Sequence, residues 1–148
     1  MTIVVWDGIT LATDSAATDG ANLWETEKAW YYMDGEYILS GAGPLQTILE
    51  MRAWFKGLAT GLPDNEFPQA QLGPDWCHFL VVDKHGLRRY EQGVNPIYHE
   101  HYKCAFGEGK DFAYGAMAMG ADAGTAVQIA IDHSTSCGME VKTYRLGD

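Results

Sequence analysis

The stretch TIVVWDGITLATD, residues 2–14, decides the expected fold because it predicts a β-hairpin. Residues 2–6 and 9–13 are rich in β-branched side chains, which favour extended strands. The dipeptide Asp7-Gly8 between them is typical of a tight turn. A turn centred on this dipeptide places Thr2 and Asp14 opposite each other on one face of the paired strands.

Two further hairpins follow the same pattern. The segments AWYYM (29–33) and EYILS (36–40) flank Asp34-Gly35, and CHFLVV (77–82) and residues 87–91 flank a turn at 83–86. Residues 102–106 and 139–145 predict single strands. Residues 14–27 are polar and turn-rich, which predicts a loop, and residues 93–101 predict irregular structure.

Three segments have apolar residues at helical spacing. They are residues 44–58, which begin at Pro44, and residues 110–119 and 122–133, which Gly120 separates. Residues 59–75 contain three prolines and predict a loop. We expect one α+β domain over residues 1–148. Two antiparallel sheets packed face to face with helices outside would bury every apolar face, although other α+β layouts fit the same propensities.

Composition excludes several classes of partner. The chain has 148 residues, 47% of them apolar, which suits one compact domain. No apolar run approaches the roughly 20 residues that cross a bilayer. The apolar stretch at the start lacks the basic flank of a signal peptide, so we predict no signal peptide. A net charge of -10 without a basic patch argues against nucleic acid and anionic membranes.

The cysteines and histidines carry weaker signals. Cys77, Cys104 and Cys137 are odd in number and far apart, which favours free thiols in a reducing, cytoplasmic setting. The run 99–101, His-Glu-His, lies near Cys104 but lacks a structural zinc spacing, so exposed edge residues are the favoured interpretation. We expect no metal and no cofactor.

Four segments, in this order, resemble one known family. GITLATDSAATDGA (8–21), ILSGAGPLQT (38–47), CAFGEGKDFAYGAMAMG (104–120) and IDHSTSCGMEV (131–141) are similar to segments of proteasome β-subunits and of the bacterial peptidase HslV. The likeness covers most of the chain, and it is strongest to short copies encoded by bacteriophages and prophages. It implies an Ntn-hydrolase fold, a four-layer αββα sandwich.

The resemblance implies that Thr2 is a nucleophile once Met1 is removed. A hydroxyl needs a base, and a terminal threonine carries its own α-amine, whose ordinary pKa is about 8. Asp14 and Lys28 match the acid and lysine that tune this amine. The alternatives are an ordinary strand residue for Thr2, a capping loop residue for Asp14 and a solvated lysine for Lys28.

Other positions match the oxyanion loop and the pocket of the family. Gly43 matches the glycine whose N–H stabilises the oxyanion, or it simply ends the strand before the next helix. The specificity pocket falls on Ala17, Gly41 and Leu45, which predicts an apolar side chain before the scissile bond.

The chain departs from the family at two places. Glu108 stands where the family has serine between two glycines, and it would either hold the α-ammonium, raise its pKa or face solvent. The Pro-rich segment 59–75 replaces a helix that contributes to subunit packing in family rings. Asp132 and Thr135 keep the spacing of the supporting acid and hydroxyl, and a plain helix C-terminus is the alternative.

The resemblance favours a threonine peptidase that acts on peptides or unfolded proteins. We expect a homo-oligomer, with a ring as one form, and an ATP-dependent unfoldase as a possible partner. We expect the protein in the cytoplasm, which is that of the host if the chain is phage-encoded. Two alternatives remain open: a catalytically inactive assembly subunit, and an Ntn amidase or acylase of a small molecule.

Overall fold

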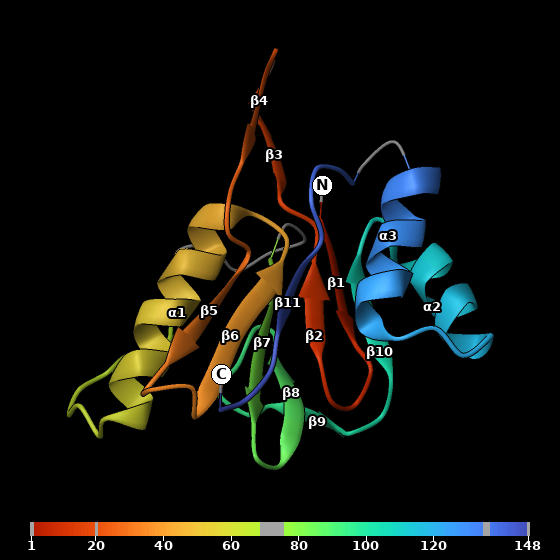
Figure 1. Cartoon of the computed structure of the whole chain (residues 1–148). Coiled ribbons are helices and arrows are strands. Elements are labelled where there is room, and N and C mark those ends of the chain that lie inside the picture. The colour runs from red at the N-terminus through yellow and green to blue at the C-terminus, as the bar shows by residue number, and fades with distance from the viewer. Residues whose placement is uncertain (1, 20, 69–75, 135–136, 148) are drawn as a thin grey trace.

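Two antiparallel sheets form the centre of the computed structural model, which describes residues 2–19, 21–68, 76–134 and 137–147 (Figure 1). The first sheet contains β1 (Ile3–Trp6), β2 (Leu11–Thr13), β10 (Cys104–Gly107) and β11 (Lys142–Tyr144), in the order β10-β1-β2-β11. The second contains β5 (Ala29–Tyr32), β6 (Tyr37–Ala42), β7 (His78–Asp83), β8 (Gly86–Tyr90) and β9 (Ile97–Glu100), in chain order. The predicted hairpins are confirmed.

Three helices in the described part cover the outer faces of these sheets. The helix α1 (Leu45–Ala59) packs on β6 and β7, whereas α2 (Lys110–Ala118) and α3 (Ala123–His133) pack on the first sheet. Figure 1 shows α1 on one side of the sheets and the α2–α3 pair on the other. The Asp122 carboxylate caps α3 by accepting the Thr125 N–H at 2.8 Å. No helix of the described residues is long and apolar enough to cross a membrane.

The core consists of three buried clusters, which explain the arrangement of the elements. One lies between the two sheets and contains Val4, Leu11, Ile38 and Leu80. A second, small-residue cluster joins the first sheet to α2 and α3, and a third, aromatic cluster joins the second sheet to α1. Because β-strand side chains alternate between faces, each sheet buries both of its faces. The predicted mixed fold with antiparallel sheets is confirmed.

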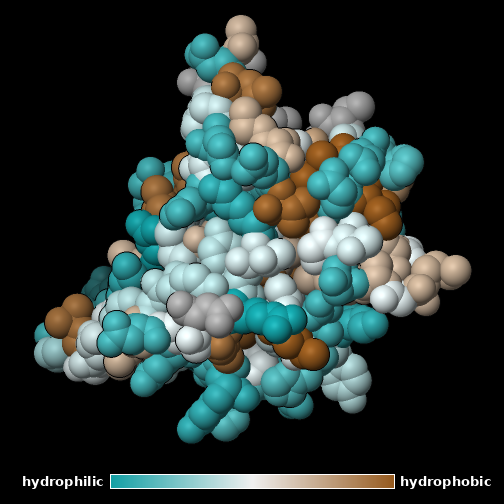
Figure 2. Space-filling view, viewed as in Figure 1, coloured by the Kyte–Doolittle hydropathy of each residue, from teal (hydrophilic) through white to brown (hydrophobic). Residues whose placement is uncertain are grey.

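The prediction that residues 14–27 form a loop is wrong. The strands β3 (Ala16–Asp19) and β4 (Asn22–Glu25) pair with each other alone among the described residues, as a two-stranded sheet that projects from the body (Figures 1 and 2). Every residue of β4 is exposed, including Leu23 and Trp24. A strand that packs on no core needs no alternation of polar and apolar residues, so its sequence resembles a loop.

The expected register of the first hairpin is also wrong, by one residue. Val4 pairs with Thr13 and Trp6 with Leu11, so Asp14 lies opposite Ile3 rather than opposite Thr2. The Asp7 N–H donates to the Thr10 carbonyl at 3.2 Å, which makes Gly8 and Ile9 the turn residues. The Asp7 carboxylate accepts the Ile9 and Thr10 N–H groups, and this side-chain cap shifts the turn onto Gly8, which has a φ of 98°.

Two smaller differences concern the edges of the sheets. The segment 93–101, expected to be irregular, contains the edge strand β9, whose side chains are mostly exposed and therefore carry no core pattern. The last strand covers three residues rather than the predicted 139–145. Within the described residues of 59–75, no helix follows α1, in agreement with the Pro-rich sequence.

Candidate active site

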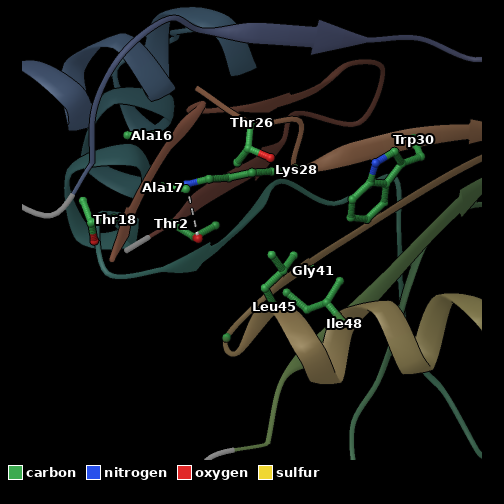
Figure 3. A pocket seen from close by; sticks show the side chains of 11 residues that line it. Thr2, Ala16, Ala17, Thr18, Thr26, Lys28, Trp30, Gly41, Leu45 and Ile48 are labelled. Carbon is green, nitrogen blue, oxygen red and sulfur yellow. Dashed lines mark hydrogen bonds between the residues drawn. The ribbon is translucent and has the colours of Figure 1, made fainter. Parts of the chain in front are cut away.

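Thr2, Asp14 and Lys28 meet at the N-terminal end of β1. The Lys28 Nζ donates to Asp14 Oδ1 at 2.8 Å and to Thr2 Oγ1 at 3.4 Å. The Lys28 side chain is 10% exposed and that of Asp14 is fully buried. Figure 3 shows the lysine ammonium next to the Thr2 hydroxyl. A hydroxyl nucleophile thus lies beside a cation that a buried carboxylate holds in place.

Asp14 is fixed by main-chain donors as well as by the lysine. Its Oδ1 accepts the Ile3 N–H at 3.2 Å, and its Oδ2 accepts the Gly138 N–H at 3.1 Å. The next residue, Ser15, donates its hydroxyl to the Glu140 carbonyl at 2.8 Å and accepts the Glu140 N–H at 2.9 Å. The segment around Gly138 therefore closes over the carboxylate and orients it toward Lys28.

The glycines between β10 and α2 bring the main chain against Thr2. The Glu108 N–H donates to the Thr2 carbonyl at 2.9 Å. Gly107 has a φ of 107°, and a Cβ on it would lie 2.0 Å from that same carbonyl oxygen. Only glycine tolerates this contact, a role that the sequence presented merely as a strand break. The exposed Glu108 side chain lines a depression together with Thr2.

A cavity of about 200 Å³ opens beside the Thr2 hydroxyl. We name it the Leu45 cavity, and the predicted pocket residues Ala17, Gly41 and Leu45 all line it. Figure 3 shows these residues around the Thr2 and Lys28 side chains. The sequence did not predict four other residues of the wall, because their neighbours in the chain form no distinctive motif. These residues are Thr18, Thr26, Trp30 and Ile48.

A second depression lies on the other side of Gly43. We name it the His78 depression, lined by Thr2, Gly43, His78, Glu108 and Lys110 among others, with a volume of about 420 Å³. Gly43 lines both hollows and has a φ of 126°. A Cβ there would lie 2.8 Å from the Cys77 Cα, so glycine allows the loop to pass close to the main chain at Cys77.

The three cysteines are poor competitors for the role of nucleophile. Burial raises the pKa of Cys77 and of Cys104 to about 12. Burial, followed by the charge of Asp14, also raises the pKa of Cys137. A thiol reacts as its thiolate, so a raised pKa disfavours the reactive form of each of these groups near neutral pH.

The supporting acid expected near the end of α3, Asp132, does not join this group. Asp132 is exposed and accepts a hydrogen bond from the Gln128 side chain at 2.9 Å, one helical turn away. This contact agrees with the alternative interpretation of Asp132, an ordinary residue near the C-terminus of a helix. Thr135 lies outside the described residues.

The histidine run at residues 99–101 has other contacts. The His99 ring packs edge-on against Phe106, with centroids 5.6 Å apart, and His101 Nδ1 lies 3.1 Å from the Gly8 carbonyl oxygen. Within the described part of the chain, no group of three His, Cys, Asp or Glu side chains has metal-binding geometry.

Comparisons with known proteins show solved structures of similar fold. No protein-family model and no curated protein matches the chain. Among solved structures, it is similar to the eukaryotic HslV from Trypanosoma brucei, with a TM-score of 0.67, 16% identity and 97% of each chain covered. It is also similar to Thiobacillus denitrificans BPH in complex with epoxomicin, with a TM-score of 0.62, 17% identity and both chains fully covered. These matches agree with the coarser part of the expectation, a mixed fold of helices and antiparallel sheets similar to HslV.

Proposed function

We propose that this chain is an N-terminal-threonine hydrolase of peptide bonds, built as one domain in the αββα layer order. The contact of Thr2 Oγ1 with the Lys28 Nζ, itself bonded to buried Asp14, carries the proposal. The three core clusters support the layer order. The likeness in fold to HslV and to a structure that holds epoxomicin supports the choice of reaction.

The chemistry requires a base other than the lysine. An ammonium has three donors and no lone pair, so Lys28 lowers the cost of negative charge on the Thr2 oxygen but cannot accept its proton. The α-amine of Thr2, free once Met1 is removed, is the candidate base. The positive charge of Lys28 disfavours protonation of that amine, which keeps its lone pair available.

The reaction then proceeds in two steps. The α-amine takes the proton of Thr2 Oγ1 while this oxygen bonds to the substrate carbonyl carbon, and the Gly43 N–H is the candidate oxyanion donor. The C–N bond breaks as the α-ammonium returns the proton to the leaving amine. Water, activated by the same amine, hydrolyses the ester and frees the Thr2 hydroxyl. These steps need no cofactor.

The first test is the intact mass of the native protein before and after treatment with epoxomicin. We expect a mass without Met1 and the addition of one inhibitor molecule, and we expect no addition to Thr2→Ala. A retained Met1 with no adduct on a protein that is folded by circular dichroism would contradict the proposal.

That contrary result would favour a catalytically silent assembly subunit. Glu108 in place of the serine of the family and the exposed Leu23 and Trp24 on the β3–β4 hairpin support this second candidate. The same exposed hairpin supports assembly into a homo-oligomer for either function, with peptides or unfolded proteins as cytoplasmic substrates. A ring, an unfoldase partner and a phage origin stay predictions, as does a small-molecule amide as substrate.

The Leu45 cavity predicts the residue that precedes the scissile bond. Its lining is mainly apolar, so peptides with leucine at that position should be hydrolysed at least tenfold faster than peptides with lysine. Replacing Leu45, which is 51% exposed, by glutamate should reverse this preference by placing a carboxylate at the cavity wall. The measurement is kcat/KM on matched leucine and lysine peptides.

The matched control uses the same substitution at the other end of α1. Leu58→Glu changes a residue that is 49% exposed and absent from the cavity wall. We expect it to keep the preference for leucine. Equal preferences in Leu45→Glu and Leu58→Glu would show that this cavity does not hold the substrate side chain.

A further inference from the structure

The two hollows beside Thr2 differ in their charged groups. Lys110 at the start of α2, His78 on β7 and Glu108 line the His78 depression, whereas Lys28 is the basic residue at the Leu45 cavity and is bonded to Asp14. The chain carries a net charge of -10, so two neighbouring basic groups at a surface hollow are a local exception.

The position of the His78 depression assigns it to the leaving side of the substrate. This assignment rests on the proposed function. If the side chain before the scissile bond fills the Leu45 cavity, the carbonyl lies at Thr2 and Gly43, which line both hollows. The chain beyond the scissile bond then continues into the His78 depression.

Lys110 supplies a charge that is available to a ligand. Its side chain is exposed, and it forms no ion pair with another described residue. The start of α2 has no side-chain cap, so the helix dipole adds partial positive charge at the same place, against the carboxylate of Asp111 in the first turn.

His78 adds a second donor, backed by further basic groups. Burial lowers the pKa of His78, and the charges of Arg89 and Lys110 lower it further, against the effect of Glu91. The His78 and His99 rings both pack against Phe106, with centroids 5.8 and 5.6 Å apart from it. Nitrogen atoms of His78, Arg89 and His99 are buried without a hydrogen-bond partner among the described residues.

Two acids lie near the depression. Glu91 Oε1 lies 3.0 Å from His78 Nδ1, although not in hydrogen-bonding geometry. Glu108 lines the depression together with Lys110 and His78, and its main-chain N–H donates to the Thr2 carbonyl at 2.9 Å. An incoming carboxylate would meet Lys110 and His78 in a partly desolvated hollow, where charge-assisted hydrogen bonds are strong.

We infer that the His78 depression binds a carboxylate of the substrate on the leaving side of the scissile bond, through Lys110 and His78. Two sources offer this group: an aspartate or glutamate directly after the bond, or the free C-terminus of a substrate cleaved near its end. Both share the same chemistry, and peptides can separate them.

The test uses quenched fluorescent peptides with leucine before the scissile bond and glutamate or glutamine after it. A second pair ends one residue beyond the bond, as the free acid or the amide. In at least one pair, we expect kcat/KM to be about tenfold higher for the peptide with the carboxylate than for its amide counterpart, which corresponds to one charge-assisted hydrogen bond. Lys110→Met should reduce this ratio to below twofold, whereas Lys84→Met, at an exposed turn away from the depression, should preserve it.

Binding separates this inference from the proposed reaction. Thr2→Ala should bind glutamate-containing peptides about tenfold more tightly than their glutamine counterparts, measured by isothermal titration calorimetry. Equal binding and equal turnover for acid and amide, or a preference that survives both Lys110→Met and His78→Gln, would overturn the inference. If Thr2→Ala shows the preference but the native protein cleaves no peptide, the proposed hydrolysis fails and the carboxylate site stands.

Discussion

Replacing Lys28 by methionine is expected to lower peptide hydrolysis by about 10³-fold, because the Thr2 oxygen loses the cation 3.4 Å away that stabilises its developing negative charge. The free energy of unfolding should fall as well, by about 3–5 kcal/mol, since fully buried Asp14 would lose its charged partner. Peptide turnover and urea denaturation measure the two effects. Lys103→Met, at an exposed position outside the site, is the matched control.

A double variant separates catalysis from stability. In Asp14→Asn with Lys28→Met, no charge is left unpaired, so part of the lost stability should return. Activity should not return, because the cation is still missing. Wild-type turnover in Lys28→Met would refute the role of the lysine, and recovery of turnover in the double variant would show that its effect is only structural.

Replacing Gly107 by alanine is expected to damage both the fold and the site. The new Cβ would meet the Thr2 carbonyl oxygen at 2.0 Å, and this oxygen belongs to the main chain, so no side-chain rotation relieves the clash. Alanine is also strained at the φ of 107° that Gly107 has. Together, the clash and this strain should lower the free energy of unfolding by about 3 kcal/mol. A displacement of Thr2 by about 1 Å should slow its reaction with epoxomicin roughly 10²-fold.

Gly115→Ala is the control for this substitution. Gly115 lies inside α2, and a Cβ there meets no described atom within 4 Å. Alanine is the better helix former, so this variant should gain about 0.5–1 kcal/mol of stability and keep its reactivity. If Gly107→Ala matched Gly115→Ala in both measurements, the close approach of this glycine to Thr2 would not matter.

Sequence patterns predicted the elements whose apolar faces enter the core. The hairpins of β5–β8 and the three helices follow from alternation and helical spacing, because burial imposes those periods. The β3–β4 hairpin and the edge strand β9 escaped prediction, since exposed strands need no such pattern.

The site was predicted through family motifs rather than through geometry. Thr2, Asp14 and Lys28 do come together, yet the pairing expected from a turn at Asp7-Gly8 is wrong by one residue. The Asp7 side-chain cap, which decides the turn, is a tertiary detail that a dipeptide preference does not contain. The contact of Gly107 with Thr2 joins distant segments and left no local signal.

The bond between Asp14 and Gly138 has a consequence for the order of events during synthesis. The carboxylate that holds Lys28 receives its Gly138 N–H donor, and Ser15 its Glu140 partner, from segments made more than 120 residues later. A chain still being translated therefore carries Thr2 without the finished carboxylate beside it. The proposed active site therefore cannot be complete before residue 140 has been synthesised.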